Sequence, residues 1–409
     1  MVNRVWTGAI DGKWETAGNW NPVGAPAVGD DAILSTGFVT LSTTITANSI
    51  AIGGSSQATL SIKNPGGTET VSGGLTISGT GRLVLDAPFV GGPGGNNLAI
   101  GGVLTNTSTD GNALAIGNIF QTSANTVTAE GLVNSGRISL FGSDTAQSTL
   151  SIAGGVAGLG TDGEVTGTVY LERNALLQFA SGQISKVASG ASLWLNGANA
   201  RVADAGATST NSALEGLSTV SGDFFLQNGA WVTTNGGLTI SGTGRLELDA
   251  PNLGGAGGSS LTIGGVLTNT SIDANALNIG NIFITSAETV TATGLVNSGR
   301  INLFGSAGAQ STLNITGGLA GFGTDEVVTG AVYLERNALL QFASGQISKV
   351  ASGASLWLNG ANARVANAGA TSTNSALEGL STVSGDFFLQ NGAWVTTNGG
   401  LTISGTGRL

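Results

Sequence analysis

The sequence predicts an all-β chain that folds as a β-solenoid, in which short strands coil around a continuous apolar core. Three observations carry this prediction: a long internal repeat, apolar residues that alternate with period two, and a high content of turn-forming residues. Glycine supplies 69 of the 409 residues, while 40% of the chain is apolar. Helices are not expected, because glycine, threonine, serine, asparagine and valine are weak helix formers.

The internal repeat is long and exactly spaced along the chain. The string GGLTISGTGRL begins at Gly73, again at Gly236 and again at Gly399. We therefore define a first repeat over 73–235 and a second repeat over 236–398. A period of this length must contain several coils of a solenoid, because one coil needs far fewer residues.

The two repeats have diverged unevenly. Residues 170–246 and 333–409 differ only at Asp204, which corresponds to Asn367. The first part of each repeat has drifted further, and this drift separates positions that tolerate change from positions that do not.

Five apolar triplets show which positions tolerate change. In each, the flanking residues stay the same between repeats and the middle residue changes. The pairs are Leu83-Val84-Leu85 and Leu246-Glu247-Leu248, Leu98-Ala99-Ile100 and Leu261-Thr262-Ile263, Leu114-Ala115-Ile116 and Leu277-Asn278-Ile279, Ile138-Ser139-Leu140 and Ile301-Asn302-Leu303, and Leu150-Ser151-Ile152 and Leu313-Asn314-Ile315. This alternation predicts strands whose flanking side chains face inward and whose central side chain faces outward.

Turn residues bound these short strands, as in Gly101-Gly102 and Asn228-Gly229. Glycine and asparagine allow the left-handed backbone that tight corners need. Coils of about 20–25 residues would give roughly seven or eight coils per repeat, each rising about 4.8 Å. A right-handed parallel β-helix is favoured, with a string of sandwiches or a propeller as the alternatives.

The predicted organisation has five parts. They are a Trp-rich cap segment over 1–50, a lead-in coil over 51–72, the first repeat over 73–235, the second repeat over 236–398 and the start of a third copy over 399–409. Since the third copy stops within the repeat, we expect the protein to continue into further repeats or a translocator.

Composition excludes several kinds of chemistry. Without cysteine the chain has no disulfides or thiolate metal sites, and without histidine it has no imidazole base and no ordinary transition-metal site. The formal net charge of −10 argues against nucleic acid and anionic membranes as partners. No apolar run reaches the roughly 18 residues of a membrane span, and no secretory signal is evident at the start.

The N-terminal segment contains three tryptophans in the string VWTGAIDGKWETAGNWNPVGAPAVGDDAIL, which starts at Val5. Later, a G-L-x-N-x-G-x-I string occupies 131–138 and 294–301. With these strings the sequence resembles the repetitive surface proteins of Gram-negative bacteria, namely autotransporter passengers and filamentous-haemagglutinin-like adhesins. The resemblance implies β-strand repeats, an adhesive role and a location outside the cell or on the bacterial surface. Their secretion signal and C-terminal translocator are not in this sequence, which leaves a type I-like export route open.

Several residues are candidates for binding. Trp6, Trp14 and Trp20 are expected to cap the first coil, with a sugar-stacking platform as the alternative. Asp30 and Asp31 are interpreted as a turn, with one corner of a calcium site as the alternative. The string Gly158-Leu159-Gly160-Thr161-Asp162-Gly163 is the nearest match to a calcium-binding repeat, but it occurs only once per repeat. Structural calcium is thus a weak possibility, and no other cofactor, metal site or catalytic residue is predicted.

Trp194 and Trp357 each stand at the centre of a Leu-Trp-Leu string and should point outward. They could contact a ligand, but packing beneath a loop is the favoured interpretation.

Acidic residues are scattered through the first repeat. They are Asp86, Asp110, Glu130, Asp144, Asp162, Glu164, Glu172, Asp204, Glu215 and Asp223. A glycosidase needs two carboxyls about 5–10 Å apart, and no such pair can be identified. Three of these residues are replaced in the second repeat, where Thr293, Ala307 and Val327 stand for Glu130, Asp144 and Glu164. Solvated surface charge is therefore the favoured interpretation.

The favoured function is a structural or adhesive β-solenoid shaft that contacts glycans or proteins on host or neighbouring cells, and no enzymatic activity is expected. Two alternatives are left open. One is a carbohydrate-active β-helix enzyme of the polysaccharide lyase or hydrolase type, which an assay of polysaccharide turnover would detect. The other is a self-assembling surface-layer material, which electron microscopy in the presence of calcium would detect.

The alternation makes a direct stability prediction. Leu98→Asp should unfold or aggregate the protein, because it places a charge in the apolar core, whereas Ala99→Asp should have a mild effect. Thermal unfolding of the two variants tests the assignment, and equal melting temperatures would refute it.

Overall fold

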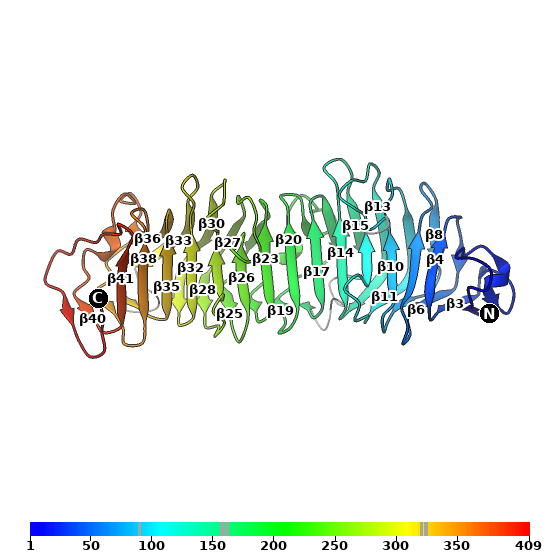
Figure 1. Cartoon of the computed structure of the whole chain (residues 1–409), viewed down its shortest axis with the longest axis horizontal. Coiled ribbons are helices and arrows are strands. Elements are labelled where there is room, and N and C mark those ends of the chain that lie inside the picture. Colours follow the sequence, from blue (N-terminus) through cyan, green and yellow to red (C-terminus); the bar gives the residue numbers. More distant parts are fainter. Residues whose placement is uncertain (89–90, 156–158, 160–162, 320–321, 323–325) are drawn as a thin grey trace. The chain divides into compact units, whose positions relative to one another are not determined.

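The computed structural model describes residues 1–88, 91–155, 159, 163–319, 322 and 326–409. Within them the chain is all-β, with parallel strands that coil as the predicted β-solenoid (Figure 1). Three short 3-10 turns lie at Ala17–Asn19, Ser212–Leu214 and Ser375–Leu377. The chain divides into an N-terminal unit, made of Met1–Ile184 and Ala191–Leu214, and a C-terminal unit, made of Ser185–Gly190 and Glu215–Leu409.

The N-terminal unit contains two sheets, which we call sheet 1 and sheet 2. Sheet 1 has the order β4 (Gly37–Leu41), β7 (Ala58–Ile62), β10 (Arg82–Leu85), β12 (Leu114–Ile116), β14 (Arg137–Phe141), β17 (Thr168–Glu172) and β20 (Ser192–Asn196). Sheet 2 has the order β2 (Trp20–Asn21), β1 (Asn3–Trp6), β3 (Asp31–Leu34), β6 (Ser49–Ile52), β9 (Leu75–Ile77), β11 (Asn97–Asn106), β13 (Asn125–Asn134), β15 (Ser148–Ile152), β18 (Ala175–Phe179) and β21 (Arg201–Asp204). Two further strands, β5 (Thr46–Ala47) and β8 (Thr68–Val71), pair with each other, and β8 also pairs with β11; β16 (Glu164–Val165) completes the unit.

The C-terminal unit has the same plan, but the two stretches that β11 and β13 join into one sheet form separate sheets there, so each coil has a distinct third side. Sheet 1 here runs β23 (Asp223–Gln227), β26 (Arg245–Leu248), β29 (Leu277–Ile279), β32 (Arg300–Phe304), β35 (Ala331–Glu335), β38 (Ser355–Asn359) and β41 (Asp386–Gln390). Sheet 2 runs β24 (Trp231–Thr234), β27 (Ser260–Ile263), β30 (Glu288–Ala292), β33 (Ser311–Leu319), β36 (Ala338–Ser344) and β39 (Arg364–Asn367). The third side consists of β19 (Lys186–Val187), β22 (Thr219–Val220), β25 (Leu238–Ile240), β28 (Val266–Asn269) and β31 (Gly294–Asn297), and then of β34 (Val327–Val328), β37 (Lys349–Val350), β40 (Thr382–Val383) and β42 (Thr402–Ile403).

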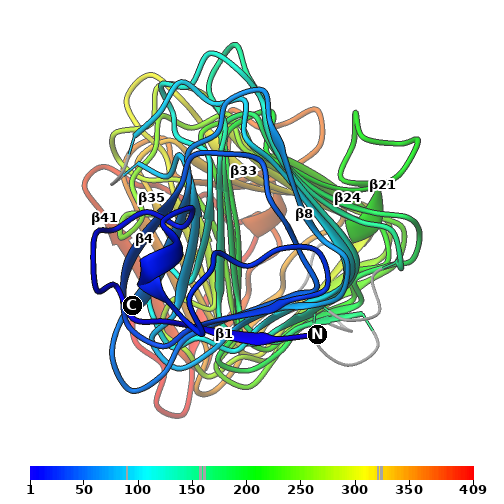
Figure 2. The same cartoon turned by 90° about the vertical axis from the view of Figure 1, so that its right-hand side faces the viewer.

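Successive coils stack in register. In the C-terminal unit, Leu246 pairs with Leu277, and Leu277 pairs with Ile301 after a shorter stretch of chain. The alternation of a long and a short coil continues with Val332 and Leu356. In the N-terminal unit, the blue and cyan coils of Figure 2 follow one common closed outline.

Each repeat therefore contains six coils, in place of the seven or eight expected. The expected coil length fits only the short coils, such as the one from Leu277 to Ile301, since every second coil is longer. At about 4.8 Å per coil, six coils rise about 29 Å.

The core consists of columns of inward-facing aliphatic side chains. One column of the C-terminal unit contains Leu246, Leu277, Ile301, Val332 and Leu356, all of them buried. Burying one such side chain contributes about 2 kcal/mol. The core is thus continuous along the stack, and each coil covers the apolar face of the coil before it.

The central residues of the triplets face away from the core on both sheets, as predicted, but only those on sheet 2 are at least partly exposed. On sheet 2, Ala99 and Asn314 are partly exposed and Thr262 is exposed. On sheet 1 the central residues are buried, including Val84, Ala115, Ser139, Glu247, Asn278 and Asn302.

Loops between the sheets cover the outer side of sheet 1 at these positions. Asn302 Nδ2 donates to the carbonyl oxygen of Ala274 at 3.2 Å, and Asn252 Nδ2 donates to Glu247 Oε2 at 2.9 Å. Alternation correctly separates the two sides of the sheet, but it cannot show that a loop buries the outer side.

The tryptophans at the N-terminus form a compact cluster. Trp20 contacts Trp6 and Trp14 edge to face, with ring centroids 5.2 and 4.8 Å apart, and Trp20 Nε1 donates to the Trp14 carbonyl at 2.7 Å. Trp6 ends strand β1, which pairs in parallel with β3, so the parallel ladders begin within the 1–50 segment, at β1 and β4. All three indoles are buried, so they offer no exposed face for a sugar.

A buried acidic pair distinguishes the second repeat. Ser259 Oγ donates to Asp249 Oδ2 at 2.6 Å, and the Ser259 amide lies 3.4 Å from Glu288 Oε1. Both carboxyls are fully buried. Burial, followed by the neighbouring Asp249 carboxylate, raises the pKa of Glu288 to about 9.

The corresponding place in the first repeat uses amides. Asp86 there accepts a hydrogen bond from Asn96, whose Nδ2 also donates to Asn125 Oδ1 at 3.1 Å. Asn125 occupies the position of Glu288, so this cluster has one acid fewer than its counterpart.

Stability of the C-terminal unit should consequently depend on pH. Because the pKa of Glu288 is higher in the folded chain than its ordinary 4.5, its contribution is complete below about pH 4.5 and is lost as the pH rises toward 9. We expect the free energy of unfolding to fall by about 2–4 kcal/mol between pH 5 and pH 8. Glu288→Gln, which imitates the protonated acid, should remove this contribution in denaturant titrations and leave the smaller one from Glu247, whose pKa burial raises to about 7.

Asn125→Gln is the matched control in the first repeat, since it replaces an uncharged group by another. It should leave the slope unchanged. The assignment is wrong if Glu288→Gln shows the same pH dependence as the unmodified chain.

Candidate functional site

A row of side chains with both aromatic and polar character lies on the outer side of sheet 1 in the C-terminal unit. The alternation that buries Val332 and Leu334 turns Tyr333 and Glu335 outward on β35. The next strand, β38, likewise turns Trp357 and Asn359 outward. We call Tyr333, Glu335, Arg336, Trp357 and Asn359 the aromatic–polar face of the second repeat.

The register between coils places aromatic residues next to aromatic residues on neighbouring strands. Tyr333 pairs with Trp357, and Trp357 with Phe388 on the following strand, β41. The Tyr333 and Trp357 rings meet edge to face with centroids 5.1 Å apart, and Trp357 and Phe388 are 5.6 Å apart. Phe304 lies 5.7 Å from Tyr333 on the other side. The result is a continuous aromatic column, in which these four side chains are all partly exposed.

A polar row runs beside the aromatic column. Asn359 Nδ2 donates to Tyr333 Oη at 2.7 Å, and Tyr333 Oη donates to Glu335 Oε2 at 2.8 Å. Burial raises the pKa of Tyr333 above its ordinary value, so its hydroxyl keeps its proton and can hold the Glu335 carboxylate. The chain of hydrogen bonds fixes the orientation of both polar side chains next to the rings.

Corner residues enclose the polar row at the ends of the strands. Arg336 and Asn391 have left-handed backbones, with φ values of 57° and 50°, while Gly360 between them has φ 130°. Left-handed backbone suits glycine and is tolerated by asparagine, but it is unfavourable for most other residues. The corner at Arg336 nevertheless carries a long cationic side chain.

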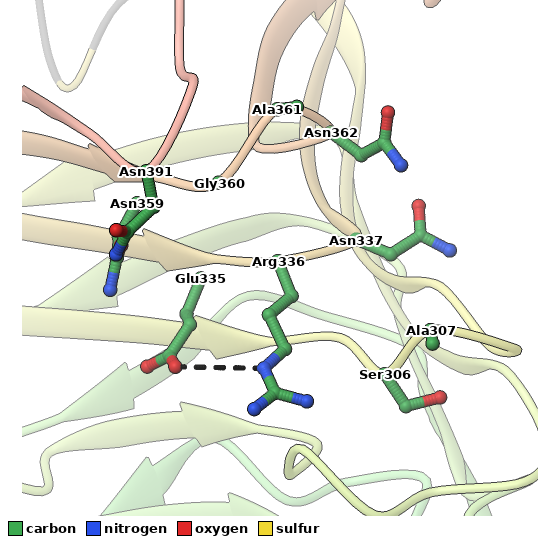
Figure 3. A pocket seen from close by; sticks show the side chains of 10 residues that line it. All are labelled: Ser306, Ala307, Glu335, Arg336, Asn337, Asn359, Gly360, Ala361, Asn362 and Asn391. Carbon is green, nitrogen blue, oxygen red and sulfur yellow. Dashed lines mark hydrogen bonds and ion pairs between the residues drawn. The ribbon is translucent and has the colours of Figure 1, made fainter.

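These corners line a pocket of about 450 Å³ (Figure 3). In it the Glu335 and Arg336 side chains lie next to each other, 3.9 Å apart between Oε1 and Nε. Asn359 and Asn391 lie together at one side, where Asn391 Nδ2 donates to Asn359 Oδ1 at 2.5 Å.

A second hollow of about 260 Å³ lies over the aromatic column. Its lining includes Arg300, Tyr333, Trp357, Asp386 and Phe388. Tyr333 and Trp357 thus contribute to the hollow, while Glu335 and Asn359 on the same strands contribute to the pocket.

The first repeat carries the same arrangement in the N-terminal unit. Tyr170 and Trp194 meet edge to face at 5.1 Å, Tyr170 Oη donates to Glu172 Oε2 at 2.8 Å, and Asn196 Nδ2 donates to Tyr170 Oη at 3.0 Å. Burial, the largest cause, together with the Glu172 carboxylate raises the pKa of Tyr170 to about 12. Arg173 occupies the corner with φ 55°.

The two copies differ beside the corner arginine. In the first repeat, Arg173 Nη1 lies 3.5 Å from the carboxylate of Asp144. In the second repeat Ala307 occupies the place of Asp144 and lines the pocket. Arg336 has therefore lost the acidic partner that its counterpart retains.

The outward prediction for Trp194 and Trp357 agrees with these positions, but the favoured packing beneath a loop does not fit Trp357. Both indoles are partly exposed, and Trp357 lines the hollow over the aromatic column. The polar partners were missed. Alternation within the strings YLER and LWLN could have placed Glu335 beside Tyr333 and Asn359 beside Trp357.

Among the described residues, the acidic side chains named from the sequence do not converge on one place. Asp110 pairs with Arg82 at 2.7 Å, and Asp223 pairs with Arg245 at 2.7 Å, each across neighbouring coils. Asp249 and Glu288 do meet, but they are fully buried and out of reach of a polymer.

The two calcium candidates have different outcomes. Asp30 accepts a hydrogen bond from Arg4 Nε at 2.8 Å, and Asp31 accepts from Ser49 Oγ at 2.6 Å, so both carboxylates are engaged by neighbouring side chains. In the Gly158–Gly163 string, Gly158 and 160–162, including Asp162, lie outside the described residues. Among those described, no three acidic side chains cluster as metal ligands.

No helix within the described ranges is long and apolar enough to cross a membrane. Comparison with known proteins finds no match to a family model, a curated protein or a solved structure.

The corner beside the pocket yields a stability prediction. A Cβ added at Gly360 would lie 3.0 Å from the Arg336 Cα, and its φ of 130° is unfavourable for any other residue. Gly360→Ala should therefore lower the free energy of unfolding by about 1–3 kcal/mol. Gly308→Ala, where a Cβ would meet nothing within 4 Å, should be close to neutral in the same denaturant titration. A neutral Gly360→Ala would contradict the assigned corner.

Proposed function

We propose that this chain is the structural and adhesive shaft of a large secreted or surface-displayed bacterial protein. The observation that carries the proposal is the regular stacking of coils, in which each coil pairs with the coil before it and the coil after it through parallel strands. Such neighbour-to-neighbour contacts make a stiff element whose length follows the number of repeats.

Two further features support this role. The near-identity of 170–246 and 333–409 indicates a recent duplication, which lengthens a shaft without altering its core. The outer surface repeats along with the core, so each added repeat also brings another aromatic–polar face. Contacts with glycans or proteins of host or neighbouring cells would then be multiplied by copy number.

In this proposal the chain contributes mechanical extension and contact, with no catalytic step and no cofactor. The resemblance of its N-terminal segment to autotransporter passengers and filamentous-haemagglutinin-like adhesins also favours a position outside the cell.

Surface display and modularity can be tested together. Antibodies against the chain should label intact cells of the producing bacterium. Removal of residues 236–398 should keep the label and the fold, because it joins segments that already share one register, while lowering adhesion to target cells. The melting temperature of the purified shortened chain should stay within about 5 °C of the original.

Removal of 236–333 serves as the control, because it ends inside strand β35 and joins the chain about half a coil out of register. This variant should fail to fold. Antibody label that appears only after cell lysis would contradict surface display. Unfolding of the chain that lacks residues 236–398 would contradict the modular shaft.

A further inference from the structure

The aromatic–polar face of the second repeat combines two kinds of group that recognise sugars. Partly exposed rings of Tyr333 and Trp357 offer apolar surface with an electron-rich face, which suits the C–H groups of a pyranose ring. The Glu335 carboxylate, the Asn359 amide and the Arg336 guanidinium offer acceptors and donors within the adjoining pocket. A largely apolar floor with a few oriented polar groups is the usual composition of a small-molecule site.

The geometry also suits an extended chain of sugars. The aromatic column continues from coil to coil through Phe304, Tyr333, Trp357 and Phe388, with neighbouring ring centroids 5.1–5.7 Å apart. This spacing follows from the distance between hydrogen-bonded strands, about 4.8 Å. Because that distance is close to the length of one pyranose unit, successive sugars could lie over successive rings.

Arg336 provides a second, independent observation. Its left-handed backbone would suit glycine, the residue used at the next corner, Gly360, and yet a long cationic side chain stands there. Its counterpart Arg173 is held by Asp144, whereas the change to Ala307 leaves Arg336 with Glu335 at 3.9 Å. The guanidinium is half-exposed and lines the pocket, so it can donate to a ligand.

Charge indicates the class of glycan. The Glu335 carboxylate and the Arg336 guanidinium balance each other within the pocket, and the whole chain has a net charge of −10. A polyanion would be repelled by the chain, while hydroxyl groups can bind to both members of the Glu335–Arg336 pair.

We propose that the aromatic–polar face of the second repeat is a binding site for an uncharged, extended glycan. Pyranose rings pack against Trp357 and Tyr333, whose rings stand nearly perpendicular to each other, and their hydroxyl groups bind Glu335, Asn359 and Arg336. The corresponding face of the first repeat binds the same glycan more weakly, because Asp144 competes for Arg173. This inference deepens the proposed adhesive role and rests on it for its biological setting, but not for its chemistry.

The test is a binding screen with the purified full chain. The probes are immobilised hexasaccharides of glucose, xylose, mannose and galactose in their common linkages, together with acidic hexamers of glucuronic and galacturonic acid. We expect the chain to bind at least one uncharged hexamer. The double variant Trp194→Ala/Trp357→Ala should lower that affinity about tenfold or more, because it removes the central ring from both faces.

Matched variants separate recognition from folding. Phe283→Ala removes an aromatic side chain that is 80% exposed elsewhere on the C-terminal unit, and should not change binding. Trp357→Phe should retain most of the binding that Trp357→Ala loses. Melting curves identify any variant that fails to fold. In that case the test relies on Trp357→Phe and on the variants Ala307→Asp and Asp144→Ala.

The role of Arg336 is tested by exchanging the residues at positions 144 and 307, which differ between the repeats. Ala307→Asp should give Arg336 an acidic partner and lower the affinity of the second face about twofold to fivefold, as expected for an exposed ion pair. Asp144→Ala should strengthen the first face by a similar factor.

The proposal is overturned if no uncharged hexamer binds, if binding is confined to the acidic hexamers, or if Trp194→Ala/Trp357→Ala binds as well as the original chain. Loss of glycan binding would leave surface labelling of intact cells unaffected, so this inference and the proposed shaft can fail separately.

Discussion

The parallel, in-register stacking of coils is the constraint on which the rest of this structure depends. Each inward column, such as Leu246, Leu277 and Ile301, is apolar because every member must fill the same place in successive coils. A shift of one residue would turn the whole column outward. The register also decides what lies on the outer side, since it aligns Tyr333 with Trp357 and Glu335 with Asn359.

Divergence between the repeats follows from this constraint. The inward leucines of the triplets are unchanged, whereas buried positions on the outer side of sheet 1 have become polar, as in Val84 to Glu247. Glu247 persists there because Asn252 donates to it, although burial raises its pKa to about 7. The outer side can therefore change its chemistry while the core stays fixed, and a binding face could arise there at little cost to folding.

Much of the fold could be predicted from the sequence. The long internal repeat and the period-two triplets were sufficient for a solenoid with inward Leu98 and outward Ala99. The number of coils could not be predicted, because long and short coils differ in the loops between strands, where there is no apolar pattern to count. The burial of Glu247 was missed for the same reason. In the candidate site, Trp357 could be placed by alternation, but the loss of a partner for Arg336 depends on a corner that brings Ala307 near it in space.

The alternation of long and short coils limits how such a gene can change. A long coil always stacks on a shorter one in the second repeat. Insertion or deletion of a single coil would bring two coils of the same kind together, whereas any even number preserves the pattern. The smallest heritable step that keeps the pattern is therefore a pair of coils. A copying error that moves a whole repeat of six coils satisfies this rule, so length variants of the array should differ in discrete steps.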